Sequence, residues 1–454
     1  MTARRVALVC FCVSACSSSG GANASDAGSG NGGGATGGQG TSGTTSTGGA
    51  TSTGGSTSSG GGTTTTGGAS GSGGASGSGG ATVPFEAGPP PPNPCLEEGG
   101  SCPPGTWIDV TPAGVDLTNQ LDCGNYGTET MQADAKTPGV FYTLFMCQGI
   151  FRSTDYGQSW KGPINTGAHG ADAGDCAGGI TISPKNSTSP PIIYEACIRG
   201  NGNGFWKSTN GGVDWTNYNV APGAARQDFY PPVVDPYDEK HLLMPGHEMN
   251  VLVESADGGE TWTAVNTDAG MQQDGGTAEV VFVDTGDPAT TRTTFLWLAQ
   301  QSTKYGTWRT TNDGANWTKV DKNEHPHGTS QLFQPDSKGV VYMAGAYSDF
   351  GWGVLRSADY GVTWAHVGSM GSQAVVFGTA KDVYAMSSGA VSLGTTLDPT
   401  FETSAAPGTG TWTMPGTPAG MTVGAAQAAV TNDGTHNIIV TANWGAGIWR
   451  YIEP

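Results

Sequence analysis

One eight-residue stretch recurs five times and constrains the fold more than any other feature of the chain. Its template is Ser/Thr-x-Asp/Asn-x-Gly-x-x-Trp, and its copies occupy residues 153–160, 208–215, 255–262, 310–317 and 357–364. The third residues of successive copies are 55, 47, 55 and 47 residues apart. Repetition at this period indicates stacked copies of one supersecondary unit.

The residues around each copy predict short β-strands. In the first unit, the apolar run 140–146 and the segment Gly149-Ile150-Phe151-Arg152-Ser153 precede the repeated stretch. Such β-branched and aromatic runs are typical of strands, and no segment shows a long apolar period of 3.6 residues. Each unit is therefore predicted to contain four strands, named A to D from the axis outward, with the repeated stretch as the turn between C and D.

The chemistry of the repeated stretch predicts a structural role. Its Asp or Asn can accept hydrogen bonds from backbone N–H groups two or three residues further on. Its Gly permits a positive φ, and its Trp is expected to begin strand D and to pack between adjacent units.

These repeats resemble the Asp-box (BNR) repeat of sialidases, of xyloglucan-active glycosidases and of the sortilin ectodomain, all of which are β-propellers. The resemblance extends from about Trp107 to Tyr451 and implies the fold rather than an activity. The Phe-Arg-Ile-Pro segment of the sialidases is absent from this chain. Met146 stands where the xyloglucanase family places a catalytic Asp, three residues before the Gly-x-aromatic-Arg strand.

Counting the units predicts seven blades. Five blades contain the repeated stretch, and a sixth without it ends near Trp412, 48 residues after Trp364. The segment 447–451 matches strand C but nothing after it matches strand D, whereas Trp107-Ile108-Asp109-Val110 matches strand D. The two ends are expected to pair and to close the seventh blade, which removes free sheet edges. The expected fold is an all-β, seven-bladed propeller over residues 107–454.

The first 106 residues predict export and attachment to a membrane by lipid alone. Residues 1–15 resemble a lipoprotein signal peptide, with Arg4 and Arg5 before a short apolar run and with small residues before Cys16. Cys16 is the expected lipidation site, and an ordinary signal peptide with an incidental Cys is the alternative. Residues 16–94 are rich in Gly, Ser and Thr and predict a flexible linker with a reach of roughly 50 Å. Residues 95–106 form a small segment that a Cys95–Cys102 disulfide is expected to cap.

Six cysteines remain after Cys10, Cys12 and Cys16 are set aside, and an even number in an exported chain predicts disulfides. Cys123 and Cys147 lie before strand A and at the end of strand B of one unit. Cys176 and Cys197 hold the same places one unit later. The expected pairs are therefore Cys123–Cys147 and Cys176–Cys197.

Charge and strand direction indicate where a ligand would bind. The chain has 38 acidic and 19 basic residues, a formal charge of −19, which disfavours nucleic acids and strongly anionic glycans. Strand alternation places the repeated turns on one face and the D–A and B–C loops on the other, at the mouth of the central channel. Five of the seven histidines are expected on or near that second face: His169, His247, His325 and His327 in its loops, and His241 nearby at a strand start.

The loops of the second face supply the candidate site residues. The candidate catalytic residues are Asp228, His247 and Glu248. The candidate substrate-binding residues are Arg199, Arg226, Tyr230, Gln301, Tyr305, His325, His327, Tyr347, Trp352 and Trp444. Aromatic rings that stack on sugars, together with carboxylates and amides that bind hydroxyls, are typical of a glycan site. No cofactor or metal is expected, although His247, His325 and His327 offer an alternative zinc site.

The leading hypothesis is a monomeric, surface-anchored recognition module for extracellular polysaccharide or for a protein partner. The alternative is a glycan-degrading hydrolase or lyase with its active site on the same face, for which Glu324, Asp349 and Glu129 are further candidate carboxylates beside Asp228 and Glu248. A hydrolase needs two carboxylates across the scissile bond, and their spacing in the sequence selects no pair. An assembly factor remains a third class.

Overall fold

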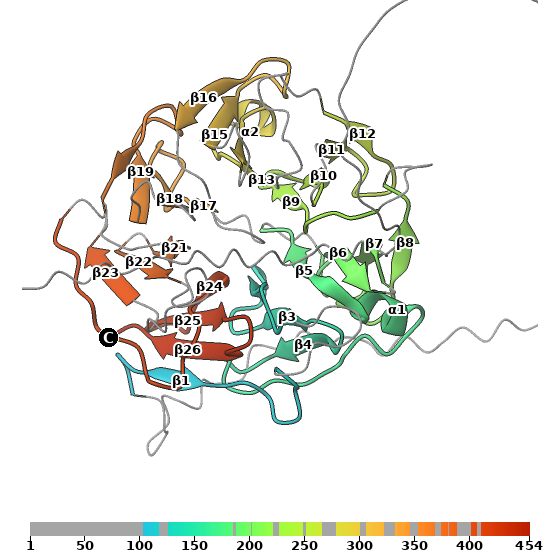
Figure 1. The fold of residues 1–454 in the computed structure, drawn as a ribbon, viewed down its shortest axis with the longest axis vertical. Coiled ribbons are helices and arrows are strands. Elements are labelled where there is room, and N and C mark those ends of the chain that lie inside the picture. Colours follow the sequence, from blue (N-terminus) through green and yellow to red (C-terminus); the bar gives the residue numbers. More distant parts are fainter. Residues whose placement is uncertain are drawn as a thin grey trace, which may run out of the picture. The chain divides into compact units, whose positions relative to one another are not determined.

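The computed structural model describes residues 103–117, 126–184, 188–200, 202–220, 227–247, 251–265, 278–299, 306–321, 332–345, 353–367, 374–379, 381–387, 401–405 and 410–454. Their strands form seven antiparallel sheets arranged as blades around a central axis (Figure 1). The predicted all-β, seven-bladed propeller is therefore confirmed. No helix within these ranges is long and apolar enough to cross a membrane.

The blades follow one another along the chain. Blade 1 contains β2 (Gln132–Ala133), β3 (Phe141–Phe145) and β4 (Gly149–Ser153). Blade 2 contains β5 (Cys176–Ile182), β6 (Ile193–Gly200), β7 (Gly204–Ser208) and β8 (Thr216–Tyr218). Blade 3 contains β9 (Val233–Asp235), β10 (Asp238–Pro245), β11 (Leu252–Ser255) and β12 (Thr263–Ala264). Blade 4 contains β13 (Ala278–Phe282), β14 (Phe295–Ala299), β15 (Gly306–Thr310) and β16 (Thr318–Asp321).

The remaining blades include the two predicted from degenerate sequence. Blade 5 contains β17 (Leu332–Phe333), β18 (Val341–Gly345), β19 (Gly353–Ser357) and β20 (Ala365–His366). Blade 6 contains β21 (Ala374–Gly378), β22 (Asp382–Ser387) and β23 (Phe401–Ala405). Blade 7 contains β24 (Gln427–Asn432), β25 (Asn437–Ala442), β26 (Ile448–Ile452) and, on its outer edge, β1 (Trp107–Asp109). Two short helices, α1 (Gly170–Gly174) and α2 (Pro288–Arg292), lie in connections.

The blades are held together by strands that are apolar on both sides. In β3 every residue is buried. Phe141 and Phe145 pack with Ile438 and Val440 of blade 7, whereas Tyr142 and Leu144 pack in a separate cluster with residues of blade 2. Because successive side chains of a strand point to opposite faces, a run without polar alternation can occupy a position between two other blades.

The ring closes as predicted, through strand β1 of the N-terminal part and β26 of the C-terminal part (Figure 1). Trp107 pairs with Tyr451, and Asp109 pairs with Trp449. The N–H groups of Gly105 and Val110 extend the pairing to the carbonyls of Ile452 and Ile448, at 2.9 and 3.0 Å. The pairing of β1 with β26 completes a four-stranded blade from segments far apart in the sequence.

The repeated stretches form one turn geometry. Ser153 Oγ accepts from the N–H of Gly157 at 3.0 Å, and Asp155 Oδ1 accepts from the N–H of Ser159 at 2.9 Å. Asp257 accepts from both Glu260 and Thr261. The acceptor thus bonds N–H groups three and four residues further on, where the sequence analysis expected two or three. In each copy the fourth residue and the following glycine both have positive φ.

Each turn packs on the blade that precedes it. The Trp of each of the five turns lies in a cluster with residues of the preceding blade, as the sequence predicted. Cations of strand C also reach the next turn. Arg450 and Arg309 donate to the carbonyl oxygens of Tyr156 and Tyr360, at 2.7 and 2.8 Å. Lys207 Nζ lies 3.2 Å from Glu260 of the following turn.

Strand direction defines two faces. The turn face carries the repeated turns and the A–B connections, and the loop face carries the D–A and B–C connections. On the loop face, strand A therefore begins and strand B ends. The candidate residues Asp228, His247, Arg199 and Trp444 all fall at such strand ends.

Candidate functional site

Five of the predicted site residues lie in the described part of the chain: Arg199, Asp228, Tyr230, His247 and Trp444. The others lie outside the described residues, and these are Arg226, Glu248, Gln301, Tyr305, His325, His327, Tyr347 and Trp352. The structure brings the five into two groups on the loop face.

Asp228, Tyr230 and His247 meet at the loop-face end of blade 3. A bridge between Phe229 and Gly246 joins the two segments. The N–H of His247 donates to the carbonyl of Asp228 at 2.9 Å. The side chains also meet, because His247 Nδ1 lies 3.0 Å from Asp228 Oδ1, and the imidazole makes an edge contact with the Tyr230 ring at 5.2 Å between centroids. A carboxylate at Nδ1 fixes the orientation and tautomer of an imidazole.

Trp444 and Arg199 belong to a second group, where blades 7, 1 and 2 adjoin. Trp444 pairs with Thr128, its N–H donating to the Thr128 carbonyl at 2.7 Å. Its φ is 48°, which is a sparsely populated conformation for a residue other than glycine. The close approach of the two backbones also requires a glycine at position 127, because a Cβ on Gly127 would collide with the Trp444 carbonyl oxygen. Such backbone positions are held by their surroundings and cluster at binding sites.

Tyr126 adds a hydroxyl and a ring to this second group. Arg199 Nη1 donates to the Tyr126 hydroxyl oxygen at 3.0 Å, which links the end of β6 to the segment leading into blade 1. Both side chains, like that of Trp444, are half-buried. Burial raises the pKa of Tyr126, so the hydroxyl stays protonated and can donate. Two aromatic rings and a guanidinium therefore adjoin solvent on the loop face.

Two buried carboxyl groups come from the innermost segments of blades 1 and 4. Glu129 follows Thr128, and Glu279 is the second residue of β13, near the loop-face start of strand A in blade 4. Each is 3% exposed. Burial raises the pKa of Glu129 well above its usual range, and the charge of Glu279 raises it further. Glu129 Oε1 has no hydrogen-bond partner among the described residues.

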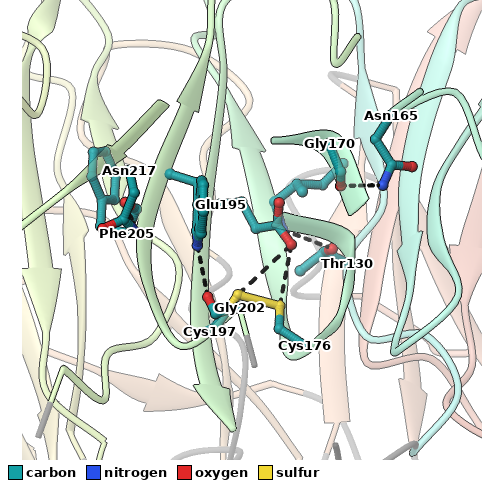
Figure 2. Close-up of a disulfide and its surroundings, with 11 residues drawn as sticks. Thr130, Asn165, Gly170, Cys176, Glu195, Cys197, Gly202, Phe205 and Asn217 are labelled. Atoms are coloured by element: carbon teal, nitrogen blue, oxygen red, sulfur yellow. Dashed lines mark hydrogen bonds between the residues drawn. A yellow bond between two sulfur atoms is a disulfide. The ribbon is translucent and has the colours of Figure 1, made fainter. Parts of the chain in front are cut away.

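A third buried carboxyl group lies beside a disulfide (Figure 2). Oε1 of Glu195 in β6 is 3.1 Å from Cys176 Sγ and 3.7 Å from Cys197 Sγ. Burial raises the pKa of Glu195 well above its usual range. Because disulfide sulfurs carry no proton, only the protonated carboxyl can place a hydrogen toward them.

The predicted Cys176–Cys197 disulfide is confirmed. Cys147 is also disulfide-bonded, but its predicted partner Cys123 lies outside the described residues, as do Cys16, Cys95 and Cys102.

Glu195 and Glu279 are site residues that were not predicted from the sequence, and His241 lies on the face opposite to the one predicted. Each glutamate interrupts an apolar strand, in Ile193-Tyr194-Glu195-Ala196 and Ala278-Glu279-Val280. A charged residue at such a position was the available signal, since it is rarely buried without a special environment. His241 lies on the turn face, because it bonds Asp235 at the end of strand A.

The described strands define the class of the protein, which is a seven-bladed β-propeller. The chain is similar to the propellers of GH74 xyloglucanases. No family model matches it. It is 22% identical over 214 residues to a "Probable oligoxyloglucan-reducing end-specific xyloglucanase" of Neosartorya fischeri, which is 43% of this chain and 22% of that protein.

A solved structure of a xyloglucanase has the same fold. The GH74 xyloglucanase from Xanthomonas campestris superposes with a TM-score of 0.52 at 17% identity, covering 76% of this chain and 53% of that one. YCF48 from Cyanidioschyzon merolae superposes with a TM-score of 0.47 at 14% identity, covering 77% and 99%. The chain thus spans about half of the xyloglucanase structure and about a fifth of the curated relative.

Proposed function

We propose that the chain is a glycan-directed, hydrolase-like propeller whose site lies on the loop face at the mouth of the central channel. The observation that carries the proposal is the Glu129 carboxyl group. It is buried, one of its oxygens has no partner among the described residues, and the charge of Glu279 raises its pKa. A carboxyl group whose pKa is raised holds its proton to higher pH and is suited to donate it to a leaving-group oxygen.

Glycoside hydrolysis uses a second carboxylate, as base or nucleophile. Glu279 is suited to this role, because coupled carboxyl groups do not ionise together: the pKa of Glu129 rises while Glu279 carries the charge. In this proposal the Glu129 hydroxyl protonates the glycosidic oxygen, and Glu279 either activates water or attacks the sugar. The leaving sugar keeps the proton that Glu129 donated.

The two loop-face groups are proposed to bind the sugar. Trp444 and Tyr126 offer aromatic surfaces for stacking, and Arg199 offers donors to hydroxyl groups. The Asp228–His247–Tyr230 group extends the site toward blade 3. The net charge of −19 and the similarity to xyloglucanases favour a neutral β-glucan such as xyloglucan.

Binding without turnover is the second candidate, and the deep burial of both glutamates favours it. Each is 3% exposed, so a substrate reaches them only if covering side chains move aside. In that case the surface of Trp444, Tyr126 and Arg199 recognises polysaccharide or a surface protein.

We also propose that the repeated turns are Asp-boxes and that the protein is exported and lipid-anchored at Cys16. The shared hydrogen bonds and the paired positive φ values of the turns support the first proposal. The sequence of residues 1–16 and the disulfides support the second.

The test combines turnover and affinity. The full chain is assayed for release of reducing ends from xyloglucan and from an acidic polysaccharide, beside Glu129→Gln and Trp444→Ala. The proposal expects release from xyloglucan only, loss of turnover with retained binding in Glu129→Gln, and weaker binding in Trp444→Ala. Tight binding without any turnover would select the second candidate, and absence of both would refute the glycan assignment.

A further inference from the structure

The seam between blades 3 and 4 departs from the repeat at three positions. The first is in strand C, at the residue that reaches toward the next turn. Every other blade with a repeated turn, and blade 7, has a cation there: Arg152, Lys207, Arg309, Arg356 and Arg450. Blade 3 has Glu254. Strand C of blade 3 therefore brings no cation toward the next turn as Arg309 and Arg450 do, and the nearby positive charge is that of Arg292 in α2.

The second departure is in the turn that faces Glu254. The fourth turn residue is Tyr or Gly in four copies: Tyr156, Gly211, Gly258 and Tyr360. In blade 4 it is Asp313, with a φ of 58° and an exposed side chain. A carboxylate of the turn thus stands opposite the Glu254 carboxylate across this seam.

The third departure is His241 in strand B. In each other blade with a repeated turn, one residue of strand B pairs with the first residue of the turn, and the equivalent of His241 immediately precedes it. These equivalents are Val140, Ile192, Thr294 and Val340. His241 precedes Leu242, which pairs with Ser255. Its side chain is fully buried.

These three substitutions converge in space. One ligand atom each of His241, Glu254 and Asp313 lie within 4.8 Å of one another. His241 Nε2 is 2.7 Å from Glu254 Oε1. On the other side of the ring, Nδ1 is 2.9 Å from Oδ2 of the buried Asp235.

We propose that His241 Nε2, Glu254 and Asp313 bind a divalent transition-metal ion, with Zn²⁺ as the best match to one imidazole and two carboxylates. Asp235 holds Nδ1, which is the usual outer partner of a metal-binding histidine and directs Nε2 at the ion. Exposure of Asp313 opens the site to solvent on the turn face, which gives the ion a path and leaves room for water.

The ion would take the place of the cation that strand C of blade 3 lacks. It would join strands B and C of blade 3 to the turn of blade 4, as Arg450 and Arg309 join their blades to the following turns. The neighbouring Arg292 pairs with Asp238 at 2.9 Å and lies close enough for its charge to act on Asp313 as well. The dication would add to this single positive charge in balancing Glu254 and Asp313. This site is separate from the loop-face site.

The test measures Zn²⁺ binding to the full, untagged chain after removal of metal, by equilibrium dialysis with elemental analysis. We expect one Zn²⁺ per chain, and a higher urea midpoint when Zn²⁺ is present. Asp313→Gly removes a ligand but suits the positive φ, as Gly211 and Gly258 do in their turns. It should fold normally and bind Zn²⁺ more than tenfold more weakly.

Asp336→Asn, which removes an exposed carboxylate of blade 5, is the matched control and should bind like the wild type. X-ray absorption should show one imidazole and carboxylate oxygens around zinc. Failure of the wild type to bind would overturn the proposal, and His241 would then only bridge two carboxylates. Binding that Asp313→Gly leaves unchanged would also overturn it, because the ion would then lie elsewhere.

Discussion

Trp107 lies in register with Tyr451 across the closing blade, and their rings are 5.0 Å apart between centroids. Trp107 also packs edge-on against Phe401 of blade 6. One side chain from the N-terminal end of the propeller therefore contacts two blades from the C-terminal end. Closure depends on residues more than 290 positions apart in the chain.

Trp107→Ala should destabilise the whole ring, because it removes a buried indole and weakens the closing pair. The expected loss in free energy of unfolding is about 3–5 kcal/mol, measured by urea denaturation. Val362→Ala, at an exposed position, should change it by less than about 0.5 kcal/mol. A closing strand that contributes nothing would give the two variants equal midpoints.

Stability should fall as pH rises, and Glu195 should cause part of the fall. Its folded-state pKa lies above the unfolded value of about 4.3. The folded state therefore holds the proton more tightly. The contribution of Glu195 to the free energy of unfolding is complete below the unfolded pKa, and it is lost as pH rises toward the folded pKa. Glu195→Gln should flatten the dependence of the urea midpoint on pH. Parallel curves for wild type and Glu195→Gln would exclude this origin.

Asp359 should act in the opposite direction. Burial alone would raise its pKa, but hydrogen bonds from Ser357, Thr363 and Val362 outweigh burial and lower it to about 2. The folded pKa is below the unfolded value, so its stabilisation is present above about pH 4 and is lost as pH falls toward 2. Asp359→Asn should cost about 1 kcal/mol at neutral pH. The cost should shrink in acid, and a constant difference between the two proteins would contradict the assignment.

The disulfides provide a direct test of strand assignment. Peptide mapping without reduction should recover Cys176–Cys197 and Cys123–Cys147. The double variant Cys176→Ala/Cys197→Ala should lose about 3 kcal/mol, since the bond closes a loop with a sequence separation of 21. Recovery of a Cys147–Cys176 peptide would require another arrangement of blades 1 and 2.

The fold could be predicted from sequence because its information is local and repeated. The turn 153–160 and its copies count the blades, and the unmatched strands around Trp107 and Tyr451 give the closure. The Asp228–His247 contact could also be predicted, because both residues flank one hairpin of blade 3. The coupling of Glu129 with Glu279 could not, because it joins different blades and depends on how the ring closes.

His241 shows a different limit. Its position at the start of an apolar run predicts a strand. The position does not predict on which face of the propeller the His241 side chain lies or which side chains it contacts. That depends on the pairing of Leu242 with Ser255 and on the packing of blade 4 against blade 3.

The rate of reducing-end release from xyloglucan across pH tests the proposed function most directly. We predict release by the wild type that declines at high pH as Glu129 loses its proton, and no release by Glu129→Gln. Because the charge of Glu279 raises the pKa of Glu129, Glu279→Gln should shift any residual decline to lower pH. Equal profiles for wild type and Glu129→Gln would contradict the account, as would a wild type that binds xyloglucan but releases no reducing ends at any pH.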